Sequence, residues 1–192
     1  GLLVERFLVR PLYGRSIDDP LLLTFGLSLV LVEAARLIWG KIGLTFDSPP
    51  ALAGAVNLGF THFPSYRLFV IALTALVLLA LWLFLERSDL GLIIRAGARD
   101  PLMVRALGID LGRIWLLVFG LGSALAGLAG ILAAPMYGVY AEMGVSMIIQ
   151  SFVVVVVGGM GSLTGAVVAG LLIGEVVGLT TLFAPQLAEI VI

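Results

Sequence analysis

Long apolar runs alternate with short polar segments along this chain, and most of the runs are long enough to cross a lipid bilayer. They cover about residues 21–39, 67–85, 114–137, 145–157 and 163–179. A helix needs roughly 20 residues to cross the hydrocarbon core, so the fourth run is short. The pattern predicts an all-α polytopic membrane protein: a single transmembrane domain over residues 1–192, with a bundle of about five complete transmembrane helices.

Both ends of the sequence predict partial helices. The opening GLLVERFLVRPLYGR is typical of the end of a span that leaves the membrane into a basic loop, and the residues from Pro185 onward are typical of the start of another span. Asp18 or Asp19, next to Pro20, is expected to cap the first complete span. Because residue 1 is Gly rather than Met, we expect a fragment that is cut at both ends.

One charged segment, residues 86–113, separates the second and third apolar runs. Its apolar residues recur at helical spacing on both sides of Pro101, which predicts two short amphipathic helices. Asp100 is expected to cap the second helix, and Gly108 to end it. The segment is too charged for the lipid interior. A docking surface for a soluble partner fits this pattern, and an ordinary helix pair on the membrane surface is the alternative.

A second polar segment, residues 40–66, follows the first span. Pro49 and Pro50 exclude a continuous helix, and apolar and small or polar residues alternate from Val56 to Thr61 as in a strand. We expect a small extramembrane loop with a β-hairpin.

Composition and charge exclude several classes of protein. The chain is 61% hydrophobic and 12% charged, far from the roughly one-quarter charged residues of a soluble domain. A net charge of −1 leaves no basic face for nucleic acid. The absence of cysteine excludes disulfides and thiolate chemistry.

The distribution of arginine predicts the orientation in the membrane. Three arginines precede the first span and five lie in 86–113, whereas 40–66 and the start of the next span contribute only Lys41 and Arg67. By the positive-inside rule, 86–113 is cytoplasmic and 40–66 faces outward. The expected location is a bacterial-type cytoplasmic (inner) membrane.

Small residues recur every four positions in the third and fifth runs. This spacing lets helix backbones approach closely in lipid. Gly170 and Gly174 are therefore expected to face another helix.

A glycine-rich segment, GGMGSLTG, follows the short fourth run. Its Gly158, Gly159 and Gly161 resemble a phosphate loop only superficially, because no Lys-Ser/Thr pair follows and the glycines are mis-spaced for a dinucleotide fingerprint. A broken helix or a tight turn between helices is the better interpretation. If this segment lies within the membrane, it is a candidate element of a translocation path.

Two acids inside the apolar runs are further path candidates, because ionisable groups in a span tend to face a bundle interior. For Glu33 the alternative is an intrahelical pair with Arg36. For Glu175, on a glycine-lined helix, structural and path roles stay open. The single histidine, His62, has no neighbouring metal-type ligands, and no catalytic set is present. The chain is therefore not expected to be an enzyme or to bind a cofactor or metal.

Several stretches together resemble the H-type permease subunit of branched-chain amino-acid ABC importers. The most specific is RAGARDPLMVRALGID, which is similar to the permease loop that docks on the ATPase in this family. Arg95 departs from the better-known Glu-Ala-Ala consensus by standing where Glu would be. The resemblance implies ATPase-docking roles for a set within 86–113: Arg95, Ala96, Gly97, Arg99, Asp100, Arg105 and Gly108.

By this resemblance, the protein is expected to be an importer subunit that lacks roughly its first third and its last span. The implied partners are ABC ATPase subunits that hold ATP and Mg, a second permease subunit and a substrate-binding protein. A stand-alone secondary carrier or channel-like facilitator is the alternative function, and a membrane anchor for a soluble complex is a third. Branched-chain amino acids, other apolar amino acids, urea and short amides remain open as substrates.

Overall fold

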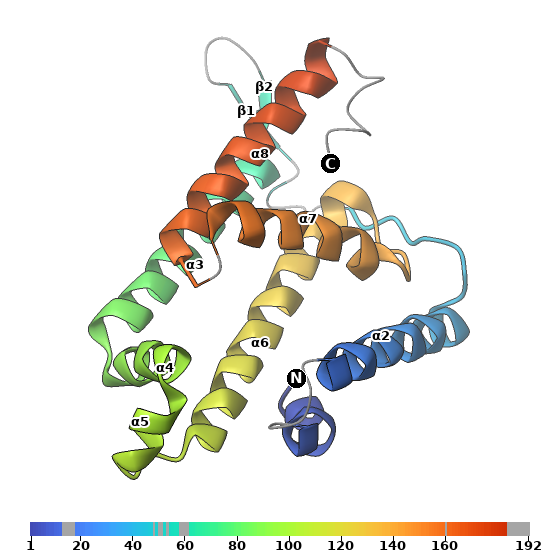
Figure 1. The fold of residues 1–192 in the computed structure, drawn as a ribbon. Helices are drawn as coiled ribbons and strands as arrows, with labels where there is room; N and C mark the ends of the chain where they lie inside the picture. The colour runs from blue at the N-terminus through green and yellow to red at the C-terminus, as the bar shows by residue number, and fades with distance from the viewer. Residues whose placement is uncertain are drawn as a thin grey trace. The chain divides into compact units, whose positions relative to one another are not determined.

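The computed structural model describes residues 1–12, 18–47, 49, 52, 54–57, 62–159 and 161–183. The chain divides into two compact units, Gly1–Ala141 and Glu142–Ile192, which are described separately. The first unit contains α1 (Leu2–Val4), η1 (Glu5–Val9), η2 (Arg10–Leu12), α2 (Asp18–Trp39), β1 (Ala55–Asn57), β2 (His62–Pro64), α3 (Ser65–Arg87), α4 (Asp89–Arg99), α5 (Pro101–Ala106) and α6 (Leu111–Tyr137). The second contains α7 (Met143–Gly158) and α8 (Leu163–Phe183) (Figure 1).

Four helices among the described residues are long and apolar enough to cross a membrane: α2, α3, α6 and α8. Almost none of the residues in these four helices are fully buried within the chain. Exposed apolar surface is unfavourable in water and suited to lipid or to other transmembrane helices. The predicted all-α membrane fold is confirmed. The remaining apolar helix, α7, has 16 residues. At 1.5 Å per residue it is about 24 Å long, which is shorter than the roughly 30 Å thickness of the hydrocarbon core.

The start of α2 corrects one prediction. The helix begins at Asp18 rather than after it, so Asp18 and Asp19 lie in its first turn and are not its cap. Acidic side chains are favourable in a first turn because the helix dipole is positive there. The predicted partial span after Pro185 lies outside the described residues.

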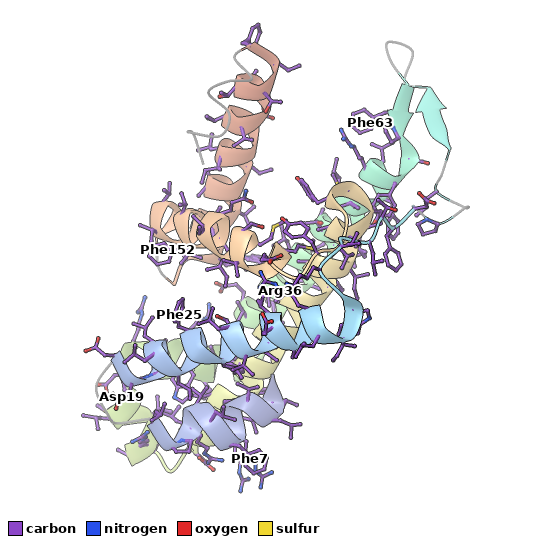
Figure 2. All side chains as sticks on the ribbon, turned by 90° about the vertical axis from the view of Figure 1, so that its right-hand side faces the viewer. Phe7, Asp19, Phe25, Arg36, Phe63 and Phe152 are labelled. Atoms are coloured by element: carbon purple, nitrogen blue, oxygen red, sulfur yellow. The ribbon has the colours of Figure 1, made fainter. Side chains whose placement is uncertain are left out.

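The N-terminal segment forms short helical turns that pack along α6. A Cβ atom added to Gly120 would lie 2.6 Å from a methyl carbon of Leu2, so this glycine allows the close approach. Figure 2 shows the segment, which carries the labelled Phe7, running beside α2. The segment is therefore part of the first unit's packing and not a free end.

The hairpin predicted in 40–66 is confirmed. Strands β1 and β2 pair antiparallel, with Ala55 opposite Pro64 and Asn57 opposite His62. The predicted alternation ran from residue 56 to 61, but only its first two positions lie in β1, and residues 58–61 lie outside the described part of the chain.

Candidate functional site

The α4–α5 segment begins with a sharp turn out of α3. The Ser88 hydroxyl accepts a hydrogen bond from the Gly91 amide at 3.0 Å and caps α4. Gly91 is buried, and a Cβ atom there would collide with the carbonyl group of Leu85. Glycine is therefore required for α4 to fold back beside the end of α3 (Figure 1).

The predicted cap between α4 and α5 is confirmed. The Asp100 carboxylate accepts hydrogen bonds from the amides of Leu102 and Met103, both at 3.0 Å, and Pro101 occupies the first helical position. These bonds satisfy two amides that the first turn of a helix leaves without partners. Gly108 has a φ of +80° just beyond the end of α5, as expected of a terminating glycine.

The helix pair packs against the start of α6. Leu111 is 1% exposed, and Val104 of α5 is also buried. A Cβ atom at Gly97 would lie 2.9 Å from a methyl carbon of Leu111, so Gly97 faces α6 rather than the surface. The structure gives Gly97 a packing role, because a buried glycine allows the two helices to approach closely, and its docking role stays a prediction.

The other predicted docking residues lie at the surface. Ala96, Arg99, Asp100, Arg105 and Gly108 are exposed, and Arg95 forms a surface ion pair with Glu86. Arg113, from the same charged segment, pairs with Asp110 at 3.1 Å. Within the described residues, no ion pair involves Arg99 or Arg105. Both guanidinium groups therefore stay available to carboxylates on another protein.

The apolar face of α5 also points outward. Leu102, Met103 and Leu107 are 76%, 62% and 73% exposed. Exposed large apolar residues beside unpaired arginines are typical of a contact region. We call the exposed set the α4–α5 surface: Ala96, Arg99, Leu102, Met103, Arg105 and Leu107.

The glycine-rich segment is a tight turn between two helices, which confirms that prediction. Gly159 and Gly161 have φ values of +87° and +91°, and Gly158 lies so close to Gly165 that a Cβ atom on either would collide with the other's backbone. The segment follows helix α7 and not a strand, so the strand-to-loop context of a nucleotide site is absent.

Glu175 does not lie beside the glycines of the α7–α8 turn. It lies twelve residues along α8 from Leu163, which corresponds to about 18 Å at 1.5 Å per residue. Its side chain lines an open hollow of about 440 Å³ together with Gly170, Gly174 and Gly178. A Cβ atom at Gly170 would lie 3.7 Å from Val154 of α7, whereas one at Gly174 would meet no atom within 4 Å. Among the residues that the structure describes, only the first of the two glycines faces another helix.

Glu33 forms the intrahelical pair that was the alternative to a path role. Its carboxylate accepts a hydrogen bond from Arg36 at 3.2 Å, one turn along α2. Both side chains are at least one-third exposed, and Figure 2 shows Arg36 toward the end of α2 that is opposite Asp19. The pair accounts for the acid without a translocation path.

No cluster of His, Asp or Glu suited to a metal ion occurs in the described part of the chain. Two features escaped the sequence patterns. Glu5 is fully buried, and neither carboxylate oxygen has a hydrogen-bond partner among the described residues. The available signal was an acid in LLVERFLV, where Glu5 and Arg6 are the only charged residues. The second is a cavity between α3 and α6, whose lining residues on the two helices are at least 50 positions apart.

The similarity of this chain to known proteins extends over its whole length. A family model described as "Branched-chain amino acid transport system / permease component" matches residues 1–192. The chain is 35% identical over 181 residues to the high-affinity branched-chain amino acid transport system permease protein BraD of Pseudomonas aeruginosa, and 30% identical over 180 residues to LivH of Escherichia coli. Each match covers 91% of this chain and 58% of the relative.

A second type of permease is also similar. LivM of Escherichia coli is 36% identical over 121 residues, which are 60% of this chain and 28% of that protein. No solved structure matches the chain. The apolar helices and these similarities agree on a multi-pass membrane protein, and the chain belongs to the family of branched-chain amino acid transport permease components.

Proposed function

We propose that this chain is the transmembrane permease subunit of an ATP-driven ABC importer for branched-chain or other apolar amino acids. The subunit is not itself catalytic and moves substrate inward by alternating access. The α4–α5 surface carries the proposal. It presents exposed apolar side chains, and arginines that form no ion pair among the described residues, on helices fixed by an Asp cap and by packing on α6. A loop that only tethers two spans needs none of these features.

The α4–α5 surface lies on the cytoplasmic side by the positive-inside rule and docks on ABC ATPase subunits, which hold ATP and Mg. The similarity to both LivH and LivM supports pairing with a second permease subunit. A substrate-binding protein delivers the amino acid from outside, across a bacterial-type inner membrane. The chain spans 58% of the length of BraD and LivH, so the whole importer's activity is tested on the complete subunit.

Charge changes on the α4–α5 surface test the proposal. The complete importer is purified with Arg99→Glu or Ala96→Arg in this subunit. An exposed charge contributes at most about 1 kcal/mol to the folded permease, whereas a desolvated contact with a partner is worth several times more. We expect normal membrane insertion, several-fold less co-purified ATPase and loss of leucine-stimulated ATP hydrolysis.

The matched control is Lys41→Glu, a charge reversal on the exposed segment between α2 and the hairpin. It should leave ATPase co-purification and ATP hydrolysis at the wild-type level. Wild-type assembly and transport in both α4–α5 variants would overturn the importer and favour the stand-alone carrier.

A further inference from the structure

An apolar cavity of about 580 Å³ lies between α3 and α6. Tyr66, Phe69 and Leu73 line it from α3, and Ser123, Gly127 and Leu128 from α6. The volume falls within the roughly 300–1,000 Å³ of small-molecule sites. A glycine and a serine where α6 faces the cavity leave space that larger side chains would fill.

Contacts at both ends of the cavity hold the two helices. At one end the Tyr66 hydroxyl donates a hydrogen bond to the Leu132 carbonyl at 3.0 Å. Toward the other end, α4 links the helices, because it follows α3 directly and packs through Gly97 against Leu111 of α6. The space between them is therefore built into the fold.

The Tyr66 end of the cavity also supplies hydrogen-bond acceptors. Pro135 has no amide hydrogen, so the carbonyl of Ile131, four residues earlier in α6, lacks its helical donor. Ile131 and Leu132 both line the cavity, next to the Tyr66 hydroxyl. An ammonium group is a donor that suits a freed carbonyl and a phenolic oxygen.

We propose that this cavity binds the transported amino acid, with its aliphatic side chain against Phe69, Leu73 and Leu128. Its ammonium group lies at the Ile131 carbonyl and the Tyr66 hydroxyl. The inference rests on the proposed function and gives it a binding site. A lipid chain would fill the apolar part but would leave the freed carbonyl without a donor. The cavity is open rather than enclosed, and we place the carboxylate of the amino acid at its open part.

Filling the cavity is the first test. The complete importer, with its ATPase and binding protein, is reconstituted in liposomes with Gly127→Leu or Gly122→Leu. Both glycines are on α6 and have no atom within 4 Å of an added Cβ, but only Gly127 lines the cavity. A leucine side chain at position 127 would occupy the open space that the amino acid needs, so Gly127→Leu should lower ATP-driven leucine uptake about tenfold or more. Gly122→Leu should transport leucine like the wild type.

Protection of a single cysteine is the second measurement. The chain has no cysteine, so Gly127→Cys and Gly122→Cys each introduce one thiol. With cysteine-free partner subunits, saturating leucine should slow alkylation by N-ethylmaleimide several-fold at position 127 and leave position 122 unchanged.

The outcomes separate the two proposals. The site is overturned, and the importer left intact, by one combination of results. The wild type takes up leucine, Gly127→Leu transports it fully, and leucine gives no protection at position 127. Equal loss in both leucine variants indicates a packing defect and also overturns the site. If the alkylation rate at position 127 depends on the lipid but not on leucine, an acyl chain occupies the cavity and the proposed amino-acid site is overturned. A wild-type complex that takes up no amino acid overturns both proposals.

Discussion

At the scale of single residues, Gly97 lies where α4 meets α6. A Cβ atom there would lie 2.9 Å from a methyl carbon of the buried Leu111, so that side chain would have to shift to make room. Gly97→Val should destabilise the subunit by about 1–3 kcal/mol, because added bulk in a packed contact forces the helices apart. Thermal unfolding of the purified subunit in detergent measures this.

The matched control for this prediction is Ala96→Val at the exposed neighbouring position. It should change the unfolding temperature little. Equal stability of the two variants would show that α4 does not pack on α6 through Gly97.

Sequence reasoning identified the cap at Asp100 but not the packing contact of Gly97, for a physical reason. A cap depends on neighbours two and three positions away, so Asp-Pro before an apolar periodicity is sufficient to identify it. The contact of Gly97 is with Leu111, which is fourteen positions away and becomes a neighbour only after α5 has turned the chain. The family motif marked the glycine as notable without distinguishing a docking role from a packing role.

At the scale of elements, length and apolar composition predicted the spans, because a helix alone satisfies every backbone group in lipid. The helix ends differ from the prediction by a few residues, as at Asp18, because polar residues can continue a helix beyond the membrane. The α7–α8 turn was predicted as one of two forms, a broken helix or a tight turn. The backbone contact between Gly158 and Gly165 identifies the second form.

This contact makes a prediction for the α7–α8 unit. Gly165→Val should separate the two helices and lower the thermal stability of the subunit, because the added side chain meets the carbonyl of Gly158 and not a flexible group. Gly174→Leu, on the same helix with open space around it, should leave the unfolding temperature of the isolated subunit unchanged. Unfolding curves in detergent compare the two variants. Similar losses in both would show that the α7–α8 contact is not special.

At the scale of the whole molecule, the topology is testable because the chain has no cysteine of its own. A single introduced cysteine can report which side of the membrane a position faces. Ser16 and Ser48 lie outside the described residues, so we choose Arg99 and Asp47, which are described and exposed. Arg99→Cys should react with an impermeant maleimide only from the cytoplasm, and Asp47→Cys only from outside. Labelling of position 99 in intact cells would invert the predicted orientation.

The α3–α6 cavity belongs to this scale, which explains why no sequence pattern revealed it. Tyr66 and Leu132 are 66 positions apart and meet through one hydrogen bond. Periodicity describes the faces of one helix but does not specify which helix a face meets. The small residues of 114–137 were expected to allow close approach of another helix, whereas Gly127 lines open space within the described part of the chain.

A short backbone clasp links two distant helices of the first unit. Leu44 and Val139 exchange two hydrogen bonds, at 2.8 and 2.9 Å, just beyond the ends of α2 and α6. Gly40 and Gly138, with φ values of +88° and +74°, lie between the clasp and each helix. These main-chain bonds couple the two helix ends without depending on side-chain identity, except that proline at position 44 or 139 would remove an amide donor. A side chain at Gly40 or Gly138 would strain the backbone that leads from each helix into the clasp.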